Sequence, residues 1–90
     1  MIQAEPQTQW ADAWPVFQIE WVQSAWRIRK TSDLDIDTWP SHVKNSIYGN
    51  YLIEIGRMQL TGLNPALRMA ANLAKRMIDY EVRKQMGDAS

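Results

Sequence analysis

Hydrophobic positions recur with a helical period in three stretches of the chain. The longest covers residues 64–86, where apolar side chains occupy well over half of the helical circumference. Asn64 is a suitable N-cap, Pro65 fits the first turn, and Gly87 supplies a stop. An apolar arc this wide needs neighbours on two or more sides. We therefore expect this helix to be the most enclosed one, with the rest of the chain packed around it.

A second helical stretch runs from Asp12, a good N-cap, to about Lys30. Its apolar face repeats every three or four residues over four turns. That face consists of Trp14, Phe17, Trp21, Ala25 and Ile28. The flank beside it consists of Ile19, Val22 and Trp26. The sequence thus predicts a helix that buries about half of its circumference.

The remaining helix is predicted between these two. Thr38 is its expected N-cap, Trp39 and Pro40 fall in its first turn, and it runs to about Leu60, with Gly62 ending it. Its apolar half consists of Val43, Ile47, Tyr48, Tyr51, Leu52, Ile55 and Met58. The stretch before it alternates aspartates with apolar residues, and its three aspartates favour a loop over a strand.

Two glycines inside this predicted helix allow two interpretations. His42, Gly49 and Gly56 recur every seven residues and share one face, which predicts a groove where a bulky side chain meets the backbone. Alternatively, Gly49-Asn50 ends a short helix and a new one begins at Tyr51.

Together these patterns predict an all-α fold, a compact bundle of three principal helices. Ninety residues suffice for one modest core. Residues 1–9 are polar and aperiodic and are expected to form an extended N-terminal arm, followed by a single helical domain over residues 10–90. We expect the last helix to lie between two apolar groups, one of Val43, Ile47 and Ile55 and the other of Trp14, Phe17 and Trp21.

The composition indicates a folded, non-membrane protein. Hydrophobic residues make up 46% of the chain and its formal net charge is zero, unlike the composition of disordered chains. The sequence has no cysteine, no apolar run of the roughly 20 residues that span a bilayer, and no secretion signal at its N-terminus. We expect a cytoplasmic location, either in a host cytoplasm or in a virion if a phage encodes the chain.

The motifs of common enzymes and metal sites are missing. His42 is the only histidine, Ser41 beside it points elsewhere on the helix, and there is no glycine-rich phosphate loop. An EF-hand loop counted from the first aspartate would need glycine where Thr38 stands and glutamate where Lys44 stands. We therefore expect no catalysis, no cofactor, no metal and no small-molecule substrate. The aspartates Asp33, Asp35 and Asp37 then form a solvated loop or an electrostatic contact for a basic partner.

Five tryptophans are the strongest compositional signal, because a core of this size absorbs two or three. Trp10, before the first helix, and Trp39, at the start of the next, are predicted to lie outside the core as anchors in a partner's pocket. Alternatively, Trp10 folds back over the core. This signal predicts a protein partner or a homo-oligomer.

A basic stripe on the last helix favours a different partner, nucleic acid. It consists of Arg68, Lys75, Arg76 and Arg83. Asn72 lies among these residues and only Asp79 opposes them. Such a stripe suits phosphate contacts, although solvated faces of bundle helices often have the same composition.

One further pattern is a resemblance to a group of known proteins. The order Trp10, Trp14-Pro15, Phe17, Trp26-Arg27 and Thr61-Gly62-Leu63 resembles that of short proteins encoded in the tail-assembly region of long-tailed bacteriophages. The resemblance covers about half of the chain. It implies an assembly or chaperone-like role on phage proteins without catalysis, and it transfers no binding residue.

Overall fold

The structure is a computed structural model, and it describes residues 12–58 and 62–87. Along these residues the elements are α1 (Ala13–Thr31), the short 3-10 helix η2 (Ile36–Thr38), α2 (Ser41–Met58) and α3 (Leu63–Gln85). All regular structure in these two ranges is helical, which confirms the predicted all-α bundle of three principal helices. The expected arm over residues 1–9 lies outside the described residues.

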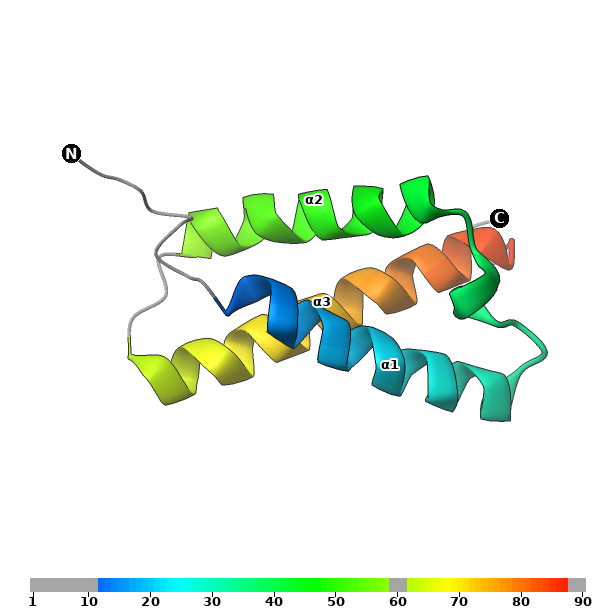
Figure 1. Ribbon diagram of the computed structural model, residues 1–90, viewed down its shortest axis with the longest axis horizontal. Coiled ribbons are helices and arrows are strands. Elements are labelled where there is room, and N and C mark those ends of the chain that lie inside the picture. Colours follow the sequence, from blue (N-terminus) through cyan, green and yellow to red (C-terminus); the bar gives the residue numbers. More distant parts are fainter. Residues whose placement is uncertain (1–11, 59–61, 88–90) are drawn as a thin grey trace.

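The three long helices lie side by side, and α3 contacts both of the others (Figure 1). α1 and α3 run in the same general direction and cross each other, whereas α2 runs the opposite way (Figure 1). The expectation that the last helix has neighbours on two sides is therefore confirmed.

Small buried residues accompany the most extensive backbone contact in the bundle, which is between α1 and α3. Short side chains let two helix axes come together, because the ridges that separate the axes are low. The small buried residues of these two helices are Ala13, Ser24, Ala25, Ala66, Ala70 and Ala74. The alanine positions of α3 thus help to explain why α1 packs mainly on that helix.

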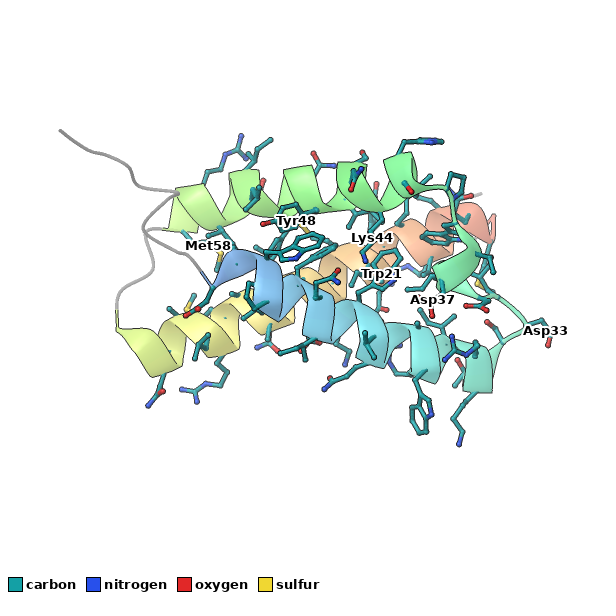
Figure 2. The ribbon with its side chains drawn as sticks, viewed as in Figure 1. Trp21, Asp33, Asp37, Lys44, Tyr48 and Met58 are labelled. Carbon is teal, nitrogen blue, oxygen red and sulfur yellow. The ribbon has the colours of Figure 1, made fainter. Side chains whose placement is uncertain are left out.

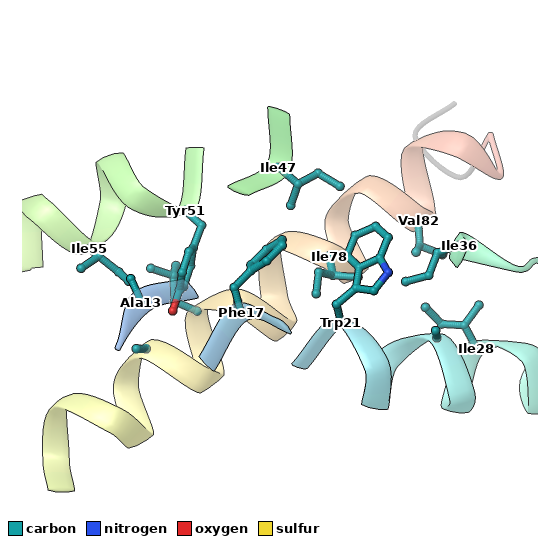
Figure 3. Close-up of a cluster of buried hydrophobic side chains, with 14 residues drawn as sticks. Ala13, Phe17, Trp21, Ile28, Ile36, Ile47, Tyr51, Ile55, Ile78 and Val82 are labelled. Atoms are coloured by element: carbon teal, nitrogen blue, oxygen red, sulfur yellow. The ribbon is translucent and has the colours of Figure 1, made fainter. Parts of the chain in front are cut away.

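Aromatic rings fill the wider space between α1 and α2. The ring centroids of Trp14 and Tyr48 lie 4.6 Å apart in an edge-to-face arrangement, and those of Phe17 and Tyr51 lie 5.3 Å apart. Figure 3 shows Phe17 and Tyr51 in the middle of the core, with Trp21 farther along α1. Because these rings are large, they keep the two backbones apart while still burying apolar surface between them.

The predicted start of the second helix is wrong. Thr38 does not cap it: its hydroxyl donates to the carbonyl of Asp35 at 2.7 Å, within the turn that forms η2. Trp39 has an extended backbone, with ψ of 148°, because a residue before proline avoids the helical region. α2 therefore begins after Pro40, at Ser41.

Both interpretations of the glycines in this helix are also wrong. α2 is continuous through Gly49 and Asn50, so the helix does not break there. Within residues 12–58 and 62–87, no bulky group approaches the backbone of this face either, because a Cβ placed on Gly49 or Gly56 would meet nothing within 4 Å. The two glycines face open space.

The ends of α3 depend on two glycines with positive φ. Gly62 and Gly87 both have φ of 77°, a conformation that favours glycine. α3 begins at Leu63, directly after Gly62, so Asn64 is inside its first turn and is not its N-cap as predicted. The predicted stop at Gly87 is confirmed, since its amide donates to the carbonyl of Lys84 at 3.1 Å.

The core contains most, but not all, of the predicted apolar faces. Ile47 and Ile55 from α2 are buried as expected, and so are Phe17 and Trp21. The buried residues of α3 are Ala66, Ala70, Leu73, Ala74, Ile78 and Val82. The apolar arc of α3 is nevertheless wider than its neighbours can cover, because Met69 and Tyr80 are 46% and 59% exposed.

Candidate protein-binding surface

A line of apolar side chains runs along the solvent side of α1, and we call it the outer stripe. It consists of Pro15, Ile19, Val22 and Trp26. Pro15 is exposed, and Ile19, Val22 and Trp26 are 55%, 64% and 60% exposed. Spacings of four, three and four residues keep the stripe within about 60° of the helix circumference, nearly opposite the buried face.

Polar groups surround the outer stripe. The ammonium group of Lys30 lies 4.4 Å from the centre of the Trp26 ring, a cation–π contact on the exposed side of α1. A groove of about 640 Å³ continues from Val22 and Trp26 toward α3. Its polar lining includes Glu20, Gln23, Ser24, Arg27 and Lys75. An apolar centre with a polar rim is typical of protein interfaces.

An ion pair joins α1 to α3 beside this groove. Arg27 donates to Oδ1 of Asp79 at 2.9 Å, and the same nitrogen lies 3.2 Å from the hydroxyl oxygen of the buried Ser24. Burial raises the pKa of the Glu20 carboxyl above its usual value, and the charges of Lys75 and Arg27 partly offset that effect. Charged groups of both signs therefore line the groove, with Glu20 and Arg27 from α1 and Lys75 from α3.

The sequence identified three of the stripe residues but not their position. The periodicity predicts Ile19, Val22 and Trp26 as a flank beside the buried face, whereas in the structure these side chains face solvent. The signal that could have located them is their spacing with Pro15, which forms a second apolar line on the same helix.

Of the two predicted tryptophan anchors, Trp39 does not join this surface. Trp39 is partly buried against the core, with its ring edge-to-face to Trp21 at 6.2 Å between centroids. This position differs from the expected one outside the core. Trp10 lies outside the described residues.

The acidic loop is largely occupied by contacts within the chain. Arg29 bridges Asp35 at 3.2 Å and Asp37 at 3.1 Å. Asp37 also accepts a hydrogen bond from the Trp21 indole. Figure 2 shows Asp37 on the side of Trp21 and Asp33 at the outer end of the loop, pointing away from the bundle. Asp35 and Asp37 are thus bound by Arg29, whereas Asp33 points away from the bundle.

The predicted basic stripe lies on the solvent side of α3. Its four residues, Arg68, Lys75, Arg76 and Arg83, are all exposed. Asp79, the acidic residue expected to oppose them, is paired with Arg27 of α1. A shallow groove of about 560 Å³ brings Lys75 and Arg76 together with Met58, Met69, Asn72 and Asp79.

Two further features bear on the kind of site. In residues 12–58 and 62–87, no three histidine, cysteine or acidic side chains come close enough together to hold a metal ion. In the same ranges, none of the helices has the length and apolar character that crossing a bilayer requires.

No protein-family model, no curated protein and no solved structure matches this chain.

Proposed function

We propose that this chain is a non-enzymatic protein–protein interaction module that binds its partner through the outer stripe of α1. The observation that carries the proposal is that Ile19, Val22 and Trp26, in line on one helix, are each more than half exposed. Contiguous exposed apolar side chains commonly mark interaction sites, and tryptophan is enriched among the residues that dominate binding energy.

The size and position of the surface support this proposal. The stripe spans about three turns of α1, and the polar groups of Gln23 and Lys30 border it. This arrangement suits a partner that lays an elongated apolar face along α1, such as another helix.

The biological role that we propose is that of an assembly factor, a small structural subunit or an inhibitor of a larger complex. The resemblance of the tryptophan pattern to short tail-assembly proteins of bacteriophages supports a phage or mobile-element origin. A virion or a host cytoplasm would then be the place of action.

The experiment compares two exposed apolar positions of the same bundle. Val22→Glu places a charge on the outer stripe, and Ile53→Glu places one on α2, where Ile53 is 56% exposed. Tagged wild-type and variant proteins are used to capture partners from a lysate of the cells that naturally produce the chain. We expect Val22→Glu to lose the captured protein and Ile53→Glu to retain it. Equal capture by wild type and Val22→Glu would contradict the proposal.

A second candidate function is nucleic-acid binding through the exposed basic stripe of α3. The observation in its favour is that Arg68, Lys75 and Arg76 are exposed, while the carboxylate of Asp79 beside them pairs with Arg27 of α1. Binding through phosphates would weaken steeply with salt. A gel-shift series with duplex DNA and single-stranded RNA, from about 20 to 200 mM salt, tests it. We expect Lys75→Ala with Arg76→Ala to reduce any shift, and no shift at low salt would exclude this candidate.

A further inference from the structure

We propose that the outer stripe binds a second copy of this chain, forming an antiparallel pair of α1 helices related by a two-fold axis. This inference rests on the proposed function, because it names the occupant of the same surface.

The apolar residues of the stripe are complementary to themselves when one helix is reversed. A pairing that places Ile19 opposite Val22 of the second copy is centred between residues 20 and 21. The same centre places Pro15 opposite Trp26 of the second copy. Every apolar residue of the stripe thus meets another apolar residue, and a two-fold axis makes each of these contacts twice.

The charges at the ends of α1 favour the same arrangement. Asp12 and Lys30 are both exposed and stand eighteen residues apart, which is five turns at about 3.6 residues per turn. They therefore project from the same side of the helix, at opposite ends. Rotation about the two-fold axis keeps a residue on the same side of the helix pair and moves it to the opposite end. Asp12 of each copy therefore lies beside Lys30 of the other copy. A parallel pair would instead place both Asp12 side chains at one end and both Lys30 side chains at the other, so these opposite charges would not meet.

The partial charges at the helix ends also favour the antiparallel arrangement. The N-terminal end of α1 carries a partial positive charge and its C-terminal end a partial negative charge, so antiparallel neighbours attract. The stripe also lies nearly opposite the face that packs on α2 and α3. Two bundles can therefore meet along α1 without contact between their other helices.

The expected dimer is weak, because its contact is confined to one pair of helices about five turns long. Such an interface falls at the lower end of the roughly 1,200–2,000 Å² found for stable complexes. We expect a dissociation constant on the order of 10–100 µM.

Sedimentation equilibrium of the purified chain from about 10 to 500 µM, a range that brackets this affinity, tests the pairing. We expect a monomer–dimer equilibrium that Val22→Glu abolishes and that the control Ile53→Glu leaves unchanged. Circular dichroism of each variant confirms that the helices are intact, and Val22→Gln serves as a milder second variant. A wild-type protein that is monomeric throughout, or a dimer that survives Val22→Glu, would overturn the inference.

Disulfide trapping tests the orientation, since the chain has no cysteine of its own. Asp12→Cys and Lys30→Cys are prepared separately and then mixed under oxidising conditions. We expect a disulfide between the two variants and little cross-linking of either one alone. Rapid cross-linking of Asp12→Cys with itself would overturn the antiparallel arrangement. As a control, Lys30→Cys is mixed with Asn50→Cys, at an exposed position on α2. Any disulfide between these two variants measures cross-linking by random collision.

The outcome for self-pairing is separable from that for the proposed function. If the chain is monomeric but captures a partner that Val22→Glu loses, only the inference that the outer stripe binds a second copy is overturned. If the chain is monomeric and Val22→Glu captures the same protein as wild type, both the self-pairing and the proposed function of the outer stripe are overturned.

Discussion

The indole N–H of Trp21 donates a hydrogen bond of 3.1 Å to Oδ1 of Asp37, and this bond fastens the loop after α1 to the core. Trp21 is itself buried against Phe17 and Trp39, and the Lys44 ammonium group lies 5.0 Å from the centre of its ring. The loop thus has a fixed position because a core side chain needs a polar partner at its edge.

Asp37→Ala is expected to destabilise the fold, whereas Asp33→Ala is not. The first substitution removes the acceptor of the Trp21 indole and one of the two carboxylates that bind Arg29. We expect a loss of about 1 kcal/mol in the free energy of unfolding, because Asp37 is partly exposed and its ion pair is screened. Asp33 points to solvent and should change the value by less than about 0.5 kcal/mol. Urea unfolding of both variants measures the difference, and equal values would contradict the role of the bond.

The glycines of α2 and of the α2–α3 connection should respond oppositely to alanine. Gly56→Ala adds a Cβ into open space and removes a flexible residue from a helix interior, so we expect up to about 1 kcal/mol of added stability. Gly62→Ala forces a positive φ on alanine and should cost about 1 kcal/mol. Thermal unfolding of the two variants checks the signs, and a destabilising Gly56→Ala would mean that the face is covered.

The helices and the fold class could be predicted because a period of 3.6 residues is a local property. The rotation of α1 about its own axis, which decides which of its side chains are buried, could not be predicted in full. Apolar residues occur on both sides of this helix, and only its packing against α2 and α3 decides that Phe17 is buried and Val22 exposed. The position of Trp39 likewise depends on a contact with Trp21, eighteen residues earlier in the chain.

Tyr51→Phe is expected to stabilise the protein. The Tyr51 ring is fully buried, and within the described residues its hydroxyl has no hydrogen-bond partner. Burial is also the main reason why the pKa of this hydroxyl is raised. Because an unsatisfied buried hydroxyl is costly, its removal should add about 1 kcal/mol to the free energy of unfolding. The matched control is Tyr48→Phe, at a partly exposed ring of the same cluster, and it should be nearly neutral. A clear loss of stability in Tyr51→Phe would reveal a bonded hydroxyl.

Glu20→Gln is expected to raise the melting temperature at pH 7 more than at pH 3. Burial raises the pKa of Glu20, so the folded state binds the proton more tightly than the unfolded state does. The stability gained by protonation is complete below the unfolded pKa of about 4.5 and is lost as the pH rises through the folded pKa. Glutamine removes the buried charge, and we expect a gain on the order of 2 °C at pH 7. A fall at pH 7 would show that attraction to Lys75 and Arg27 outweighs the cost of burial.

The ion pair between Arg27 and Asp79 should show measurable coupling, because it joins two helices and is partly buried. A double-mutant cycle of Arg27→Ala and Asp79→Ala is expected to give about 1 kcal/mol, since the side chains are 40% and 33% exposed. The control cycle uses Arg57 and Glu54, a pair three residues apart on α2 that is 72% and 41% exposed. That pair should give about 0.3 kcal/mol and lose it in 0.5 M salt. Arg27 also contacts the buried Ser24 hydroxyl, so its coupling to Asp79 should survive salt better. Equal coupling and equal salt sensitivity in the two cycles would mean that the bridge does not help to hold α1 on α3.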